Sequence, residues 1–409
     1  MHEFDSAYAP PQPPPRRMRV LLVYSVVAVI AATLDVGTTM IVHNFGIGSG
    51  AAPVTGPLLT MNDGMVYSKV EPGVVDVSAD LQYLDETAEG TGFVFNAADG
   101  LVLTNNHVID GATSVTVTPV LTGKSYPATI VGYDLRDDIA VLQVKGIPGL
   151  KAVTTGDSAD VSIGTEVLAL GNEAGQGGPP TIAPGVISNT GRSIVASDQS
   201  SDLTETLHGM LQTSADIRPG DSGGPLANAA GQVVGVDTAA GDGGPGLAYA
   251  GYAIPIDTAM AAASEIVAGH PGTQIQLGMP AFLGVLLPNS SSTSPKREAQ
   301  QQQDGTASRS GTVCLAADPG GSGTAPKSIA PASSGALVDG VVCGTAAAAA
   351  GLAAGDVITS FDGRTVTSAT ALSDVLRQER PGSRGALTWV SVGGAWHTVI
   401  VTLTAGPAG

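Results

Sequence analysis

Short runs of β-forming residues separated by glycine turns fill residues 65–268 and restrict the fold more than any other feature. Valine, threonine and isoleucine dominate runs such as GVVDVSADL, SVTVTPVL and IAVLQV, and turn signals recur roughly every 8 to 12 positions. Because β-branched residues fit a pleated surface, this pattern predicts a β-sandwich or β-barrel. Residues 257–268, DTAMAAASEIVA, change to helical spacing behind an aspartate cap and close this first domain.

The charge balance argues against one class of partner. The chain has 409 residues, with 18 lysines and arginines against 36 aspartates and glutamates and a formal net charge of -18. This length allows two or three domains. A strongly acidic chain is poorly suited to nucleic acid, which is bound through basic faces, so no nucleic-acid partner is expected.

The N-terminal region is typical of a membrane anchor. Residues 20–42 are mostly apolar with one charge, Asp35, and as a helix they would span about 34 Å, enough for a bilayer core. Three arginines lie just before them, so the positive-inside rule predicts a cytoplasmic tail at 1–17 and a transmembrane helix at 18–42. The chain is then a single-pass protein of the cell membrane, extracytoplasmic beyond a linker at 43–64. A cleaved signal peptide is the alternative.

A second unit follows a predicted linker at 269–280. Residues 281–406 combine strand-like runs such as VITSFDG and WHTVIVTL with short helical runs, which indicates a small mixed α/β domain. Residues 289–334 interrupt it with serine, glutamine, proline, glycine and alanine, and have little apolar material to bury. This composition predicts a disordered or loosely ordered insertion.

The chain has two cysteines, Cys314 and Cys343. In an exported protein they are candidates for one disulfide, which would close a loop of roughly 30 residues and contribute about 3 kcal/mol. Two unpaired thiols are the alternative. Their spacing matches no zinc motif, and neither a metal nor a cofactor is expected.

Three polar residues in separate segments suggest nucleophilic catalysis. Ser222 lies between glycines in DIRPGDSGGPL, which alone decides little in a chain with 55 glycines. His107 ends a strand-like run in LVLTNNHVIDGA. Asp138 directly precedes Ile139 and an apolar strand, so we expect it to be buried, whereas Asp137 stays solvated.

The chemistry explains each residue type. A serine hydroxyl is a weak nucleophile until a base accepts its proton, and a neutral imidazole at His107 is suited to that near pH 7. Asp138 would hold the imidazole tautomer. The glycines beside Ser222 permit a tight turn that points the N–H groups of Gly220 and Ser222 at a developing oxyanion. The order of histidine, aspartate and serine is that of chymotrypsin.

These segments resemble a known family. TNNHV, RDDIAVL and PGDSGGPL are similar to the three catalytic motifs of the HtrA/Deg family of trypsin-like serine proteases, and VLALGN, GVIS and GYAIPID resemble further segments. The resemblance covers about 200 residues. It implies a mainly β chymotrypsin-like double β-barrel with the triad between the barrels. It also implies an envelope serine endopeptidase of protein quality control that degrades unfolded or misfolded proteins, in a membrane-anchored bacterial homotrimer.

The second unit resembles a PDZ domain. AFLGVLL, GLAAGDVITSFDGRTVTS and ALSDVLRQERPGS are similar to its carboxylate-binding loop, its central strand and its peptide-flanking helix. The resemblance implies that the N–H groups of Leu283, Gly284 and Val285 receive the carboxylate of a C-terminal peptide that adds as a strand. The insertion follows that strand and departs from the family pattern.

Two kinds of substrate pocket remain open. Asp216 occupies the position of the acid that selects basic residues in trypsin. HtrA pockets are closed by apolar side chains, and the matching residues here are Ile217, Tyr252, Ala253 and Ile254. Arg218 could neutralise Asp216, so we favour an aliphatic pocket. Asp221 replaces the asparagine that is common in this family, and a structural hydrogen bond in the loop is its simplest role.

One non-enzymatic function competes with proteolysis. An envelope chaperone or peptide-sensing scaffold would bind exposed C-termini through the PDZ domain and carry an idle barrel. The intact set of nucleophile, base, acid and oxyanion glycines weighs against it, because a binding module has no need of them together. A lipase or esterase has a different residue order and alternates strands with helices.

Overall fold

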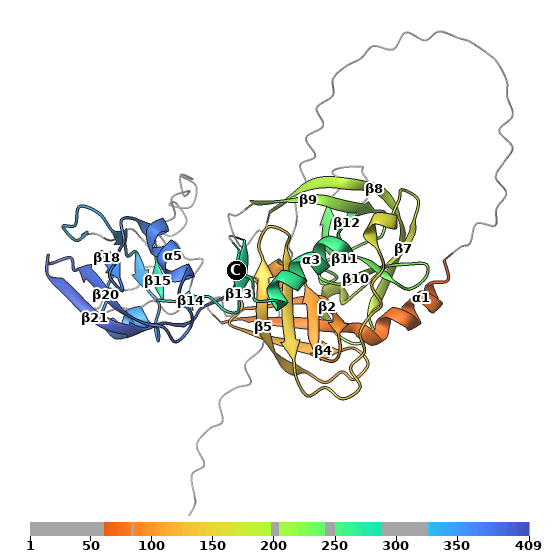
Figure 1. The fold of residues 1–409 in the computed structure, drawn as a ribbon, viewed down its shortest axis with the longest axis horizontal. Coiled ribbons are helices and arrows are strands. Elements are labelled where there is room, and N and C mark those ends of the chain that lie inside the picture. Colours follow the sequence, from red (N-terminus) through yellow and green to blue (C-terminus); the bar gives the residue numbers. More distant parts are fainter. Residues whose placement is uncertain are drawn as a thin grey trace, which may run out of the picture.

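The structure is a computed structural model that describes residues 61–82, 86–197, 204–241, 250–272, 274–287, 326 and 328–408 (Figure 1). The predicted tail and anchor, residues 1–17 and 18–42, lie outside the described residues, as does most of the insertion at 289–334. Within the described ranges, no helix has the length and apolar character needed to span a membrane.

A first barrel forms from strands in the order β5-β4-β1-β2-β3-β6, closed by pairing of β5 with β6. Its strands are β1 (Val74–Leu81), β2 (Glu86–Asn96), β3 (Leu101–Thr104), β4 (Ser114–Pro119), β5 (Tyr126–Asp134) and β6 (Ile139–Val144). Inward-facing residues that include Val77, Val94, Tyr133 and Leu142 fill its core. The short helix α2 (Asn106–Ile109) follows β3 and brings His107 to one end of the barrel.

A second barrel closes in the order β10-β11-β12-β9-β8-β7. Its strands are β7 (Glu166–Gly171), β8 (Thr181–Ser197), β9 (Thr204–Thr213), β10 (Pro225–Asn228), β11 (Val233–Gly241) and β12 (Ala250–Pro255). Helix α3 (Ile256–Val267) then packs against β5, β6 and β11, and its apolar face joins the shared core. Short 3-10 turns occur at Glu71–Gly73, Ser158–Asp160 and Glu173–Gly175.

Helix α1 (Asp63–Val70) begins inside the segment assigned to the linker at 43–64. The side chain of Asn62 accepts a hydrogen bond from the Met65 N–H and so caps the helix. Val66 and Val70 are buried in the core that the barrels share. Within the predicted linker at 269–280, β13 (Ile275–Leu277) pairs with β5 and extends the first sheet.

The remaining residues form a smaller unit, which lies to one side of the barrels (Figure 1). Its elements are β14 (Ala281–Phe282), β15 (Val285–Leu286), β16 (Ala336–Leu337), β17 (Gly340–Val341), α4 (Ala346–Ala350), β18 (Val357–Phe361), β19 (Arg364–Thr365), α5 (Ala369–Arg377), β20 (Arg384–Val390), β21 (Trp396–Thr402) and β22 (Thr404–Ala405). A separate apolar core that includes Phe361, Leu372 and Leu387 holds it together. Ser368 caps α5 by accepting from the Ala371 N–H.

The last described residues return from this unit to the first barrel. The Gly111 N–H donates to the Ala408 carbonyl at 2.7 Å, and the Ala408 N–H donates to the Ala112 carbonyl at 2.9 Å. Ala408 is buried in the core of the first barrel. This bridge attaches to the loop that directly follows the helix carrying His107.

Candidate active site

His107 and Asp138 meet at the end of the first barrel because β3 and β6 are paired and Thr104 lies opposite Ala140. Nδ1 of His107 lies 2.7 Å from Oδ2 of Asp138, and the backbone N–H of His107 donates to Oδ1 of Asp138 at 2.9 Å. These two contacts fix both the position and the ring orientation of the imidazole.

Asp138 is buried, with 3% of its surface exposed, and its backbone has a positive φ of 50°. The Thr238 hydroxyl donates to Oδ2 at 2.7 Å, and the Asn105 amide donates to the Asp138 carbonyl at 2.8 Å. A buried carboxylate needs such donors, and the strained φ is retained because they hold it. Asp137, by contrast, forms a bidentate contact with Arg136 outside this network.

Ser222 lies in the turn that precedes β10 in the second barrel. Its carbonyl accepts a hydrogen bond from the Thr91 N–H of the first barrel at 2.9 Å. Gly223 has a φ of 86°, and a Cβ there would collide with the Thr91 carbonyl and the Thr104 hydroxyl. Only glycine fits this point of contact between the barrels, which explains the residue that follows the serine.

Thr238 joins the predicted residues into one network. The Ser222 hydroxyl donates to the Thr238 carbonyl at 3.3 Å, while the Thr238 hydroxyl donates to Asp138. The sequence alone does not identify Thr238 as a site residue. The available signal was a threonine in the strand-like run QVVGVDT, and such a position has many structural explanations.

The predicted oxyanion donors, Gly220 and Ser222, lie in a turn that is fixed by hydrogen bonds to Thr91 of the first barrel. The Thr91 hydroxyl donates to the Gly220 carbonyl at 2.7 Å and accepts from the Asn172 N–H at 2.8 Å. Gly220 has a φ of 99°. Among the described residues, neither the Gly220 N–H nor the Ser222 N–H donates to a backbone or side-chain acceptor. Both groups therefore remain able to bind a ligand oxygen.

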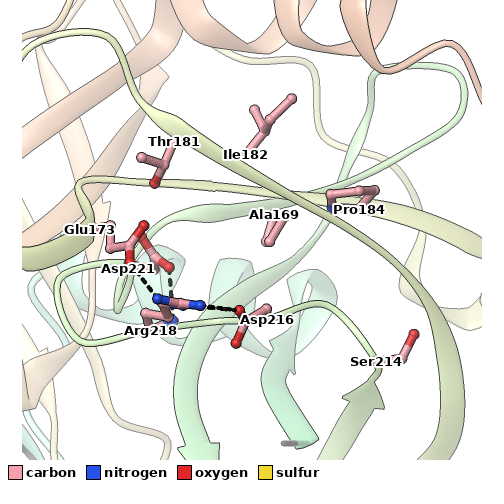
Figure 2. Close-up of a pocket in the computed structure, with 10 residues that line it drawn as sticks. Ala169, Glu173, Thr181, Ile182, Pro184, Ser214, Asp216, Arg218 and Asp221 are labelled. Carbon is pink, nitrogen blue, oxygen red and sulfur yellow. Dashed lines mark hydrogen bonds and ion pairs between the residues drawn. The ribbon is translucent and has the colours of Figure 1, made fainter.

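Asp216 lines a surface cavity of about 380 Å³ beside this turn. Figure 2 shows the Arg218 guanidinium between Asp216 and Glu173, with Ala169, Ile182 and Pro184 on the opposite wall. Two Arg218 nitrogens donate to Oδ2 of Asp216, at 2.9 and 2.6 Å, and a third donates to Glu173 at 2.9 Å. The charge of Asp216 is thus compensated within the protein.

The other predicted pocket residues do not line this cavity. Ile217, Tyr252, Ala253 and Ile254 are each at most 5% exposed and pack into the barrel cores. Matching a pocket-lining segment does not determine which side chains of that segment face the substrate. Residues 242–249, which join β11 to β12, lie outside the described residues.

The predicted carboxylate loop lies between β14 and β15. Leu283 is buried and its carbonyl accepts a hydrogen bond from the Ala347 N–H of α4 at 2.8 Å. Gly284 has a φ of 84°, and a Cβ there would collide with Thr345. Val285 is half-buried in β15, which pairs with β17. The loop is therefore held rigidly against the start of α4.

The structure describes one of the two cysteines of the predicted disulfide. Cys343 is disulfide-bonded, whereas Cys314, the other cysteine of the sequence, lies outside the described residues. Across the described ranges, no group of three or more histidine, cysteine, aspartate and glutamate side chains is arranged to hold a metal ion.

Asp76, which is buried, and Glu89, which is half-buried, lie beside the loop at residues 173–178. This loop contacts the nucleophile turn, because the Ala174 N–H donates to the Pro219 carbonyl at 2.9 Å. Asp76 and Glu89 lie on neighbouring strands, and the Ser78 hydroxyl donates to Glu89 at 2.9 Å. Burial, and then the charge of Glu89, raises the pKa of Asp76 from 3.8 to about 6, against a hydrogen bond from Gly178. Burial also raises the pKa of Glu89. Gly175 of the same loop lies against the Glu89 side chain.

We expect Asp76→Asn to stabilise the protein at pH 8 but not at pH 4. The native state binds the Asp76 proton more tightly than the unfolded state, so stability is lost as pH rises from about 4 through the native pKa of about 6. The gain at pH 8 should be roughly 1 to 3 kcal/mol, measured by urea unfolding. Asp80→Asn, an exposed position on the same strand, is the control. An equal effect of Asp76→Asn at both pH values would contradict this assignment.

Comparison with known proteins gives matches over both structural units. Residues 90–236 match the trypsin-like peptidase domain, and residues 318–390 match the PDZ domain. Serine protease PepD of Mycobacterium tuberculosis is 32% identical over 378 residues, covering 87% of this chain and 69% of that protein. The periplasmic serine endoprotease DegP of Escherichia coli is 32% identical over 288 residues, covering 70% of this chain and 50% of that protein.

A solved structure, HtrA-type protease AlgW with tripeptide, is 28% identical, with a TM-score of 0.45 over 84% of this chain and 97% of that one. The chain thus spans about two thirds of the mycobacterial relative and half of the Escherichia coli one. The family matches confirm the predicted mainly β, trypsin-like protease domain followed by a PDZ domain.

Proposed function

Since the chain belongs to the HtrA family of serine proteases with a PDZ domain, we propose that it degrades unfolded or misfolded proteins in the cell envelope through His107, Asp138 and Ser222. The observation that carries these roles is the network through Thr238, which joins the Ser222 hydroxyl to the carboxylate that orients His107. A barrel used only for binding has no need of this arrangement.

In the proposed mechanism, Oγ of Ser222 attacks the scissile carbonyl carbon while Nε2 of His107 accepts the hydroxyl proton. The imidazolium faces Asp138, whose Oδ2 lies 2.7 Å from Nδ1. Collapse of the tetrahedral intermediate breaks the C–N bond, and His107 donates its proton to the leaving amine. Water then attacks the acyl-enzyme, with His107 again as base, which releases the acid and restores Ser222.

The N–H groups of Gly220 and Ser222 are proposed to stabilise the oxyanion in both steps. Each such donor is worth on the order of 3 kcal/mol in transition-state stabilisation. Support comes from the Thr91 contacts, which hold the turn without using either N–H group. The turn is thus ordered before substrate arrives, so little free energy is spent in arranging it.

The PDZ domain is proposed to bind C-terminal peptides at Leu283, Gly284 and Val285. The contacts of this loop with Ala347 and Thr345 support the assignment, because a rigid loop loses little entropy when a carboxylate binds. The apolar run at 20–42 supports a single-pass membrane anchor with a cytoplasmic N-terminus. A homotrimer is proposed from the family resemblance alone.

Cleavage after aliphatic residues is the proposed specificity, because Arg218 already satisfies the charge of Asp216. We expect the full chain to cleave a denatured protein mixture much faster than the same mixture in its native form. Sites after valine, isoleucine, leucine and alanine should outnumber those after lysine and arginine by about threefold or more. Mass spectrometry of the new termini measures both quantities.

Arg218→Ala should increase the share of cleavage after lysine and arginine, whereas Arg192→Ala on β8 should leave it unchanged. Equal cleavage of native and denatured proteins would exclude the preference for unfolded substrates. A majority of basic sites with the unsubstituted chain would instead show that Asp216 selects the substrate.

A further inference from the structure

Asp237 is a buried acid for which the proposed mechanism has no use. It lies on β11 directly before Thr238 and is 0% exposed, and neither carboxyl oxygen has a hydrogen-bond partner among the residues that the structure describes. An ionised carboxylate without a partner is very costly to bury, so such a group neutralises instead. Burial without a partner therefore favours the neutral form of the Asp237 carboxyl group in the folded protein.

The backbone of Asp237 holds the turn that carries Ser222. Its carbonyl accepts from the Gly223 N–H at 2.6 Å, and its N–H donates to the Gly224 carbonyl at 2.8 Å. The next residue, Thr238, contacts both Ser222 and Asp138. A shift of β11 at Asp237 would therefore move the nucleophile turn and the support of the orienting carboxylate together.

A second buried acid acts on Asp237 from within this turn. Asp221 is 5% exposed; its Oδ2 accepts from the Arg218 N–H at 2.8 Å, and its Oδ1 has no hydrogen-bond partner within the described part of the chain. Burial is the main cause of the raised pKa of Asp237, and the charge of Asp221 raises it further. Burial likewise raises the pKa of Asp221 to about 7.

The charged groups around this pair lie on two sides. Glu173, Arg218 and Asp216 act on Asp221 from the cavity side. On the side of the triad, Asp138 is linked to β11 through Thr238 and faces His107. No cation is hydrogen-bonded to Asp237 among the described residues, so its ionisation would place an uncompensated charge directly beneath the nucleophile turn.

We propose that Asp237 is a positioning residue for peptide hydrolysis: as a neutral acid it keeps β11 and the turn at residues 220–224 in the reactive arrangement, and its ionisation at alkaline pH releases them. This inference rests on the proposed proteolytic function. It predicts an alkaline loss of kcat with little change in KM, because the affected groups act on the transition state.

The test compares pH profiles of the full chain from pH 6 to 10, each normalised to its own value at pH 7. Asp237→Asn resembles the neutral acid but cannot ionise. The fall in activity on the alkaline side of its pH profile (the alkaline limb) should therefore occur at a pH higher by about one unit or more. Asp221→Asn removes the neighbouring negative charge, which lowers the pKa of Asp237, so the alkaline limb should shift to lower pH. These opposite shifts are not expected from a general loss of packing.

Labelling with a fluorophosphonate supplies a second readout, in which Oγ of Ser222 displaces fluoride from phosphorus and His107 takes the hydroxyl proton. The labelling rate of the unsubstituted chain should fall over the same alkaline range. Because the folded state binds the Asp237 proton more tightly than the unfolded state, stability also falls as pH rises toward the native pKa, so labelling is measured well below the melting temperature found at each pH. Identical alkaline limbs in the unsubstituted chain and Asp237→Asn would overturn the role of Asp237, as would the absence of an alkaline limb. Failure of the unsubstituted chain to react at any pH would instead contradict the proposed proteolytic function.

Discussion

Replacing Ser222 with alanine should lower the rate of peptide cleavage by about 10⁴-fold or more. The substitution removes the oxygen that is proposed to attack the carbonyl carbon and that donates to the Thr238 carbonyl. Binding of an unfolded protein should persist, because the backbone donors and the PDZ domain are unchanged. The decisive measurement is single-turnover cleavage of a denatured substrate together with the binding affinity for that substrate.

Ser188→Ala is the matched control, since Ser188 is an exposed serine on β8 of the same barrel. It should leave the cleavage rate within about twofold of the unsubstituted value. Undiminished cleavage by Ser222→Ala would exclude the acyl-enzyme mechanism. Intact binding without any cleavage by the unsubstituted chain would favour the scaffold function.

The second large effect concerns Asp138. Asp138→Asn should lower kcat by about 10³- to 10⁴-fold near neutral pH, because an amide cannot accept from Nδ1, from the His107 N–H and from Thr238 as the carboxylate does. The imidazole would then adopt the wrong tautomer and lose its stabilising charge. Steady-state kinetics with a peptide substrate gives kcat and KM separately.

Asp137→Asn controls for the adjacent charge, because Asp137 contacts Arg136 and lies outside the network. It should change kcat by less than about twofold. Similar losses for the two variants would show that the acidic turn as a whole matters, and would remove Asp138 from its assigned role.

Residues whose roles depend on local sequence were the most predictable part of the site. The choice of Asp138 over Asp137 followed from its position beside Ile139, and the structure buries Asp138 while Asp137 pairs with Arg136. The strand pattern similarly predicts a β-sandwich or β-barrel, and the strands of the protease domain close into two barrels. Such features are set within a few residues, by burial and by the period of the strands.

Contacts between distant segments could not be predicted in this way. Thr238 lies 100 positions from Asp138, and Thr91 lies 129 positions from the Gly220 carbonyl that it binds. Their roles exist only after the two barrels have come together. The orientation of individual side chains is also hard to predict. Ile217 and Tyr252 belong to segments that resemble the lining of a substrate pocket, but their side chains pack in the apolar cores of the barrels.

The bridge from Ala408 to Gly111 and Ala112 gives the two domains a mechanical connection. Gly111 is only four positions beyond His107, so a rotation of the PDZ domain either breaks this bridge or transmits force to the helix that carries the general base. The proposed peptide site and the proposed general base therefore lie in two units that are hydrogen-bonded to each other at the end of the first barrel.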